Sequence, residues 1–175
     1  MNRDYFAEMY VAGVLADAGW NVYFPRRDQG FDFIITKLVG ERIVLRPVQV
    51  KGKYPRTGKV DRAIYGYSGR LTQTHPEMVL AIPLFATAVE AAPMFTAYLP
   101  PTQLRRLNNT PDGYRVFPAR FADGGPEVRP SYSKFFDRDG IRLMESAEWA
   151  ILPPLPPDNP EETEMGDAAS LSDSV

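Results

Sequence analysis

Apolar side chains recur every three to four residues from Asp4 to Ala18, which is the spacing of one face of an α-helix. Gly19 follows directly, and glycine commonly ends helices because it adopts left-handed backbone angles without strain. The pattern therefore predicts one amphipathic helix near the start of the chain.

After this helix, several short runs are rich in aromatic and β-branched residues, and turn residues separate them. Such runs are typical of strands, and the most continuously apolar ones are expected to be buried. The predicted strands are 20–24, 31–38, 42–50, 78–85 and 94–99.

Only residues 39–41 join the second and third of these strands, so we expect an antiparallel hairpin. Proline cannot donate a backbone hydrogen bond, and Pro47 therefore predicts that the third strand is exposed or bulged near its end. The stretch 52–69 is broken by glycine and proline, which favours a loop with at most a short helical turn.

Turn-forming residues dominate beyond residue 100. We expect a short helix over 101–107 with proline at its first position, a strand over 114–117 and a last helix over 141–151. The residues that the last helix would bury are Leu143, Met144, Ala147 and Trp149.

The order of these elements predicts an α/β protein in which helices flank a central mixed β-sheet. We expect one domain over 1–151, with a core over 1–100 and an irregular C-terminal extension over 101–151. Residues 152–175 are rich in proline and acidic side chains and hold few apolar ones, which predicts a disordered tail.

Composition narrows the chemistry. The 175 residues include no cysteine and one histidine, His75, which precedes a proline and is expected to be a turn residue. Disulfides, zinc–thiolate centres, iron–sulfur clusters and thiol nucleophiles are therefore excluded. The chain shows no apolar signal core and no run near the roughly 18 apolar residues of a membrane span, so we expect a cytoplasmic protein that does not contact the membrane.

The net charge of −2 conceals a basic segment. Residues 26–70 hold 11 Lys and Arg against 4 Asp and Glu, a local excess of +7. Such a segment is typical of a surface that faces a polyanion, and a solvated basic face is an equal alternative.

Three polar residues interrupt the apolar strands of the predicted hairpin. Asp32 stands at the start of the first strand, and Gln49 and Lys51 alternate with Val48 and Val50 at the end of the second. Because side chains alternate between the two faces of a strand, Gln49 and Lys51 are expected to share one face. The start of one hairpin strand lies beside the end of the next, so Asp32 should converge with them. The structural alternative is an ordinary half-exposed strand with a turn aspartate.

A carboxylate, an amide oxygen and a lysine at one point suit Mg²⁺-assisted hydrolysis of phosphodiesters. Asp32, Gln49 and the carbonyl of Val50 would supply hard oxygen ligands for Mg²⁺ or Mn²⁺. Lys51 would orient or deprotonate the attacking water, or stabilise charge on the phosphate. Glu8, on the mostly apolar helix, would add a second carboxylate, and a surface glutamate is an equal alternative.

Basic residues and tyrosines follow the predicted site. They are typical of a loop that contacts phosphates and stacks bases, and a solvated charged loop is the alternative. The candidate nucleic-acid-binding residues are Lys53, Tyr54, Arg56, Lys59 and Arg62, with Tyr65 and Tyr67 as further aromatic residues.

At these residues the sequence resembles the PD-(D/E)XK nuclease-like superfamily, in particular the Mrr-like branch in which glutamine replaces the last acidic residue. The resemblance rests on Glu8, on Gly30-Phe31-Asp32 and on Gln49-Val50-Lys51, and it spans residues 1–85. It implies a restriction-endonuclease-like mixed sheet flanked by helices, a Mg²⁺ or Mn²⁺ site and endonucleolytic cleavage of DNA.

Two functions follow as hypotheses. The first is a metal-dependent DNA endonuclease, a hydrolase of phosphodiester bonds. The second keeps the fold without the catalysis: a module that binds nucleic acid or a protein partner, with a homodimer or partner contact through the C-terminal region. Asp32 and Lys51 favour the enzyme, whereas neutral Gln49 and the negative total charge favour the module.

Overall fold

A computed structural model describes residues 4–27, 30–54, 65–86, 92–122 and 125–156. Within these ranges the protein is a mixed α/β structure with few helices, built on a mixed five-stranded sheet. No helix of the described ranges is long and apolar enough to span a membrane.

The predicted first helix is present as α1, Asp4–Asp17. Gly19 lies two residues beyond the helix, and its φ of +86° places it in the left-handed region. The N–H of Gly19 donates to the carbonyl of Ala16, and that of Trp20 donates to the carbonyl of Leu15, both at 3.0 Å. These two hydrogen bonds form a Schellman motif, which satisfies carbonyls that the helix end would otherwise leave unpaired.

The five strands predicted within residues 1–100 are all present and belong to the large sheet, in the order β1-β2-β3-β5-β6. Neighbouring strands are antiparallel except β3 and β5, which pair in parallel. The strands are β1 Asn21–Tyr23, β2 Phe33–Val39, β3 Arg42–Val50, β5 Val79–Leu84 and β6 Phe95–Leu99.

The predicted hairpin is confirmed. Val39 lies opposite Arg42, so Gly40 and Glu41 form a two-residue turn. Of these two, only Gly40 has a positive φ, +62°, which matches the type II′ turn that hairpins favour.

The prediction for Pro47 was wrong. Pro47 is buried and lies in regular register opposite Ile34, with no bulge. The parallel pairing of β3 with β5 begins only at Val48. Pro47 therefore leaves no residue of β5 without a donor, which explains why a central strand accepts it.

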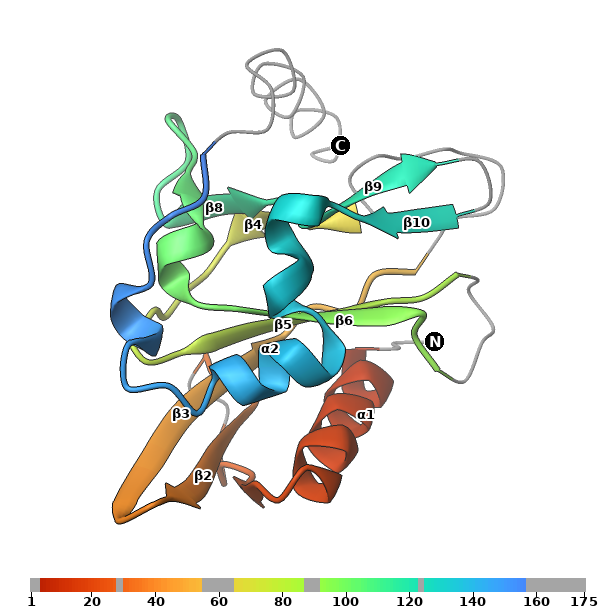
Figure 1. The fold of residues 1–175 in the computed structure, drawn as a ribbon. Helices are drawn as coiled ribbons and strands as arrows, with labels where there is room; N and C mark the ends of the chain where they lie inside the picture. Colours follow the sequence, from red (N-terminus) through yellow and green to blue (C-terminus); the bar gives the residue numbers. More distant parts are fainter. Residues whose placement is uncertain (1–3, 28–29, 55–64, 87–91, 123–124, 157–175) are drawn as a thin grey trace.

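The two α-helices cover one face of the large sheet and a small sheet covers the other (Figure 1). Helix α2, Asp137–Leu143, shares a core cluster with α1, and the small sheet has the order β4-β8-β7. Its strands are β4 Tyr67–Arg70, β7 Arg105–Arg106 and β8 Gly113–Val116. The expectation of flanking helices thus holds for one face only.

Residues 101–151 are not an irregular extension. The predicted strand 114–117 is present as β8, and the predicted helix 101–107 is a single 3-10 turn followed by β7. Two further strands form a separate pair, and two more 3-10 helices complete the region. These elements are η2 Pro101–Gln103, β9 Ala119–Ala122, β10 Gly125–Val128, η3 Pro130–Phe135 and η4 Trp149–Ile151.

The predicted last helix was misplaced. Helix α2 starts at Asp137 and ends at Leu143, and η4 delivers Trp149 to the core separately. Met144 and Trp149 are fully buried, as expected, whereas Ala147 is exposed. Residues 101–151 therefore complete the core of the large sheet rather than extend it.

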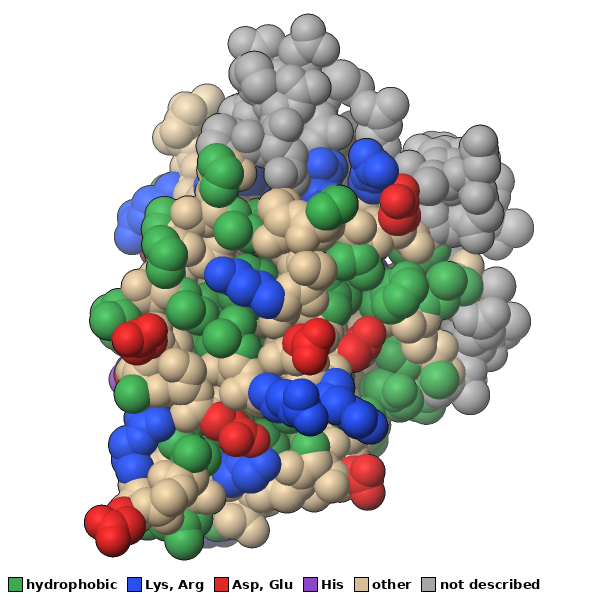
Figure 2. Space-filling view, in the orientation of Figure 1, with side chains coloured by type: hydrophobic (Ala, Val, Ile, Leu, Met, Phe, Trp, Pro, Cys, Tyr) green, Lys and Arg blue, Asp and Glu red, His purple; other side chains and the backbone are tan. Residues whose placement is uncertain are grey.

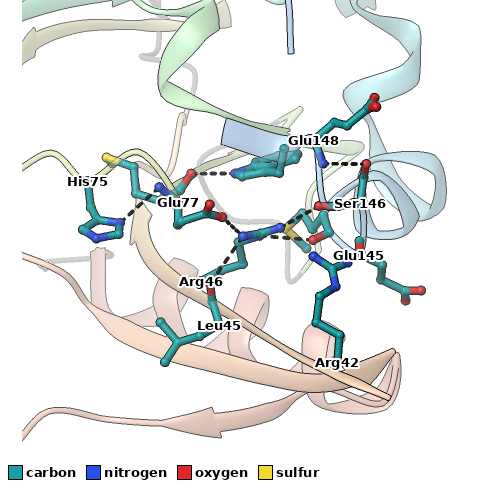
Figure 3. A network of polar contacts seen from close by, with 11 residues as sticks. Arg42, Leu45, Arg46, His75, Glu77, Glu145, Ser146 and Glu148 are labelled. Carbon is teal, nitrogen blue, oxygen red and sulfur yellow. Dashed lines mark hydrogen bonds and ion pairs between the residues drawn. The ribbon is translucent and has the colours of Figure 1, made fainter. Parts of the chain in front are cut away.

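One buried arginine connects β3 to this C-terminal region (Figure 3). Arg46 is 3% exposed, and its Nε donates to the carbonyl of Met144 at 3.1 Å. Its Nη2 donates to the carbonyl of Ser146 at 2.8 Å, and its Nη1 forms an ion pair with Glu77. The guanidinium also lies 5.9 Å from the ring centroid of Trp149.

Burial, and to a smaller extent the charge of Arg42, lowers the pKa of Arg46 to about 10. The guanidinium is therefore charged at neutral pH and needs the acceptors that surround it. Because two of these acceptors are backbone carbonyls just after α2, the network fixes where the chain runs between α2 and η4.

Arg46→Lys is expected to lower the free energy of unfolding by about 2–4 kcal/mol, because an ammonium cannot reach all the acceptors of a planar fork. The carbonyls of Met144 and Ser146 would lose their donor. Urea unfolding measures the loss. Arg42→Lys is the matched control, since Arg42 is exposed and donates to the carbonyl of Glu145, and it should cost less than about 1 kcal/mol. Equal losses would contradict the anchoring role.

Three buried tyrosines make the fold sensitive to alkali, and burial raises the pKa of Tyr65 among them. Burial raises the pKa of Tyr67 to about 12. Burial, with smaller contributions from Asp137 and Tyr10, also raises the pKa of Tyr98. As the pH rises above 10, the unfolded chain loses these protons first, so the free energy of unfolding falls. Arg46 acts in the opposite direction over the same range, because its pKa is lowered.

Thermal unfolding followed by circular dichroism should therefore show a falling midpoint between pH 10 and 12. The fall should be smaller in Tyr67→Phe than in the wild type, because phenylalanine has no proton to lose. Tyr23→Phe, which changes an exposed tyrosine, should keep the full fall. The interpretation fails if both variants follow the wild-type profile.

Candidate functional site

The candidate site lies where β2 begins and β3 ends. Asp32 immediately precedes β2, and the backbone before it turns at Gly30, whose φ is +87°. A Cβ at Gly30 would lie 2.9 Å from the Cγ of Gln73, so backbone angle and packing both favour glycine there. This local geometry delivers Asp32 to the start of the strand.

Asp32 forms hydrogen bonds with the backbone of β3 on both sides of Gln49. Its N–H donates to the carbonyl of Val48 at 2.9 Å, and its Oδ2 accepts from the N–H of Val50 at 2.5 Å. The carboxylate thus takes the place of a backbone acceptor at the end of the hairpin. The structure brings Asp32 to the end of β3, where the sequence pattern placed it.

The side chains of β3 alternate between the two faces of the sheet. Val48 and Val50 belong to the core cluster that α1 covers. Gln49 and Lys51 fall on the opposite face by alternation, and the next residue of this row is Lys53. The Nζ of Lys53 lies 5.7 Å from the ring centroid of Tyr67 in the small sheet, which confirms the direction of the row.

Gln49 is a buried polar residue in an apolar sheet. It is 6% exposed, and its Oε1 has no hydrogen-bond partner among the described residues. A buried acceptor without a donor costs about 1–3 kcal/mol, so natural sequences rarely place one in a core without a reason. A cation or a bound water would satisfy this oxygen.

Backbone pairing holds Lys51 rigidly. The N–H of Lys51 donates to the carbonyl of Ala81, and the N–H of Lys53 donates to the carbonyl of Pro83, both at 2.9 Å. The chain therefore continues alongside β5 after β3 formally ends. Lys51 is half-buried and is held in place next to Gln49 and Asp32.

Helix α1, which carries Glu8, packs on the same strand end from the helical layer. A Cβ at Gly52 would lie 2.8 Å from the Cβ of Ala7, so the first turns of α1 pack directly on the residue after Lys51. Glu8 follows Ala7 and is half-buried. The structure thus joins Asp32 to the backbone around Gln49, and it places Glu8 on the helix that packs behind this strand end, in the layer opposite to Gln49 and Lys51.

The predicted nucleic-acid-binding residues have different outcomes. Tyr54 stacks on Phe85 with ring centroids 4.3 Å apart, so one face of its ring is already covered. Tyr65 and Tyr67 are both 6% exposed and belong to the core, so the expectation that they stack on bases was wrong. Three of the predicted residues lie outside the described ranges: Arg56, Lys59 and Arg62.

The end of β3 offers few oxygen ligands for a metal ion. Across the described ranges, no group of three or more His, Asp or Glu side chains is placed to hold a metal ion. The available set is the carboxylate of Asp32, the amide oxygen of Gln49 and the carbonyl of Val50. Hard oxygens of this kind suit Mg²⁺ or Mn²⁺, and the unpartnered Gln49 oxygen fits such an ion. The remaining ligands must come from water or substrate.

Two basic features escaped the sequence prediction. Arg46 is an isolated charge inside the apolar run of β3, which is a signal for a buried, fully bonded arginine. The arginines of the small sheet gave no signal, because their strands have only two to four residues and show no alternation.

Comparison of the sequence with models of known protein families finds no match, and comparison with curated proteins finds none either. The chemistry of the site is therefore inferred from its own geometry.

Metal affinity tests the donor set. With one carboxylate and two neutral oxygens, the DNA-free protein should bind Mg²⁺ or Mn²⁺ weakly. Gln49→Glu adds a second negative charge at the buried oxygen and should raise Mn²⁺ affinity at least about tenfold in calorimetry. Gln49→Leu removes the acceptor and should not raise it.

Tight, stoichiometric Mg²⁺ binding by the wild-type protein alone would contradict this donor set. An unchanged Mn²⁺ affinity in Gln49→Glu, with the fold intact by circular dichroism, would show that position 49 does not face the ion.

Proposed function

We propose that the protein is a Mg²⁺- or Mn²⁺-dependent DNA endonuclease of the PD-(D/E)XK nuclease-like superfamily, in its Mrr-like glutamine branch. One observation carries the proposal. The carboxylate of Asp32 accepts from the N–H of Val50, which sets it between Gln49 and Lys51 at one strand end. An acidic residue at a strand start beside Gln-x-Lys is the arrangement that the sequence resemblance implies.

The order of elements supports a restriction-endonuclease-like core. Helix α1 precedes three consecutive strands, and the second strand of the hairpin pairs in parallel with the later strand β5. A mixed sheet with this order of elements is compatible with the core that the resemblance implies. The observed fold differs from the expected one in one respect: the face opposite α1 carries the small sheet β4-β8-β7 instead of a helix.

Asp32, Gln49 and the carbonyl of Val50 would hold the metal ion, and Glu8, whose helix packs on the residue after Lys51, would bind one of its waters. When bound, the ion supplies Lewis-acid activation of the phosphate and acidifies a coordinated water. The protein itself positions the ligands. Asp32 is hydrogen-bonded to the backbone of β3, so the ligands do not need to reorganise when substrate arrives.

Lys51 would act on the reacting groups directly. It follows Gln49 by two residues, on the same face and just after β3 ends, and its backbone is fixed to β5. From there its ammonium group would orient the attacking water or stabilise the charge that grows on the phosphate oxygens. Water would attack the phosphorus as the bond from phosphorus to one sugar oxygen breaks, and a proton of the water would end on that departing oxygen.

The rival function is a catalytically inactive module of the same fold that binds nucleic acid or a protein partner. Neutral Gln49 favours this second function, because Asp32 is then the one carboxylate at the strand end that would bind the metal directly. The two functions differ in what a charge-neutral substitution of Asp32 does.

Cleavage of supercoiled plasmid DNA in Mg²⁺ or Mn²⁺ separates them. Asp32→Asn keeps an oxygen that accepts from the N–H of Val50 but removes the charge, so it should fold normally and lose at least about 10²-fold in cleavage rate. Asp32→Ala should lose the same activity and also about 1 kcal/mol of stability, because the N–H of Val50 loses its acceptor.

Lys51→Ala should likewise lose at least about 10²-fold, and Lys51→Arg, which keeps the charge but cannot deprotonate water, reports whether charge alone suffices. If Asp32→Asn and Lys51→Ala both keep full activity, the cleavage comes from a contaminant or from another site, and the proposed site is wrong. Absence of metal-dependent cleavage by the wild-type protein on every DNA form would leave the binding module.

A further inference from the structure

The hairpin of β2 and β3 has an apolar outer face that is open to solvent near the turn. Ile35 and Val44 point into the core cluster on the helical side, so the alternate residues of the two strands point to the opposite side. Near the end of β3 that opposite side is buried, but toward the turn it is exposed. The exposed fractions there are 67% for Leu38, 72% for Ile43 and 49% for Leu45.

These outward-pointing side chains form one continuous patch across β1, β2 and β3. Directly opposed residues of neighbouring strands point to the same face, and their Cβ atoms lie about 5 Å apart. Tyr23, which is 54% exposed, extends the patch onto β1. We call the patch the hairpin face, and its opposed pairs are Leu38 with Ile43, Thr36 with Leu45, and Tyr23 with Ile34.

The hairpin face holds no charged side chain. The charged residues of the same strands point to the helical layer, where Lys37 pairs with Glu145 and Arg42 donates to the carbonyl of Glu145. Figure 3 shows Leu45 pointing away from the guanidinium of Arg46. A contiguous apolar patch on the surface is typical of a site of protein association.

The lack of charge selects a partner surface that is also uncharged. A charged surface would lose its hydration on this face without gaining an ion pair or a hydrogen bond. A second copy of the chain supplies a matching surface by symmetry, because a two-fold axis sets the same patch against itself. Residues 157–175 are a poor match, since their six acidic side chains would be desolvated there.

The hairpin also has the position and size for such a contact. Its turn lies at the periphery of the molecule, away from the small sheet (Figure 1), so two hairpins can approach face to face. The exposed parts of the patch amount to roughly 500 Å² per copy, or about 1,000 Å² in a dimer, which is near the lower limit for a specific interface. The dimer is therefore expected to be weak and to depend on concentration.

We propose that two copies of the chain pack their hairpin faces against each other across a two-fold axis. The contact is made by the large sheet and not by the C-terminal region. It uses no ligand of the candidate metal site, so the inference does not rest on the proposed function. Asp32→Asn should dimerise as the wild type does.

Sedimentation velocity over a range of protein concentrations measures the association. The wild-type chain should shift from 19.7 kDa toward twice that mass as its concentration rises to about 0.5 mM. Ile43→Arg should weaken dimerisation at least about tenfold, because the guanidinium would be buried without an acceptor, and Leu38→Lys should do the same. Both variants replace exposed side chains, so their circular dichroism should match the wild type. A wild-type chain that stays monomeric over the whole range would overturn the proposal.

The matched control changes an equally exposed isoleucine elsewhere. Ile151 on η4 is 76% exposed, and Ile151→Arg should dimerise as the wild type does. The alternative apolar surface is the outer side of α1, where Met9 is 41% exposed. Dissociation by Met9→Arg but not by Ile43→Arg would assign the contact to α1 and overturn the proposal.

Salt separates an apolar contact from a charged one. Basic and acidic side chains lie side by side over α2 (Figure 2), and a contact through them would weaken as salt screens the charges. Raising NaCl from about 50 to about 500 mM should not raise the Kd of a dimer formed through the hairpin face. Loss of the dimer at high salt would contradict the proposal.

The absence of cysteine allows the contact to be mapped directly. Leu45 lies in the middle of the hairpin face, so Leu45→Cys should give a cross-linked dimer with a short bifunctional maleimide. Ala147, which is exposed between α2 and η4, supplies the control, and Ala147→Cys should stay monomeric under the same conditions. Equal cross-linking of both variants would indicate random encounters and would overturn the proposal.

Discussion

The antiparallel pairing of β2 with β3 fixes the position of two polar side chains that the large sheet buries, Arg46 and Gln49. The turn at Gly40 sets a register that carries through seven residue pairs to Phe33 opposite Val48. In this register β3 turns Arg46 into the helical layer and Gln49 to the opposite face. A slip of one residue would exchange the two faces, so that Arg46 would lose its carbonyl acceptors and the valines would leave the core. The burial of both faces therefore selects the register that also assembles the candidate site.

Arg46 and Gln49 lie three residues apart and are almost equally buried, yet their environments differ in kind. The guanidinium of Arg46 is met by an ion pair and by carbonyl acceptors, so it connects two parts of the fold. The amide oxygen of Gln49 is met by no donor of the described residues. An apolar residue there would avoid the desolvation of that oxygen, so Gln49 lowers stability without a structural gain. Sites that break a packing rule in this way are where function is expected.

Prediction from sequence succeeded where an element is long enough to show a period. Helix α1 and the hairpin were predictable because each extends over several repeats of its spacing, and Asp32 with Gln49 followed from the hairpin alone. Residues 101–151 were not, since strands of two to four residues carry no readable alternation. Pro47 misled because its tolerance depends on where β5 begins to pair, and Tyr67 misled because its burial depends on a sheet that forms across distant segments.

The charges at the candidate site bear on how metal and DNA would cooperate. Asp32 and Lys51 have opposite charges, so a divalent ion beside them leaves an excess of positive charge that a phosphate must balance. Under the proposed function, a DNA phosphate at this point would balance that charge and complete the metal shell at once. Because coupling between two ligands is reciprocal, the factor by which DNA raises metal affinity must equal the factor by which metal raises DNA affinity. We infer that a site whose only firmly placed carboxylate is Asp32 would bind metal strongly only when a polyanion such as DNA is bound as well.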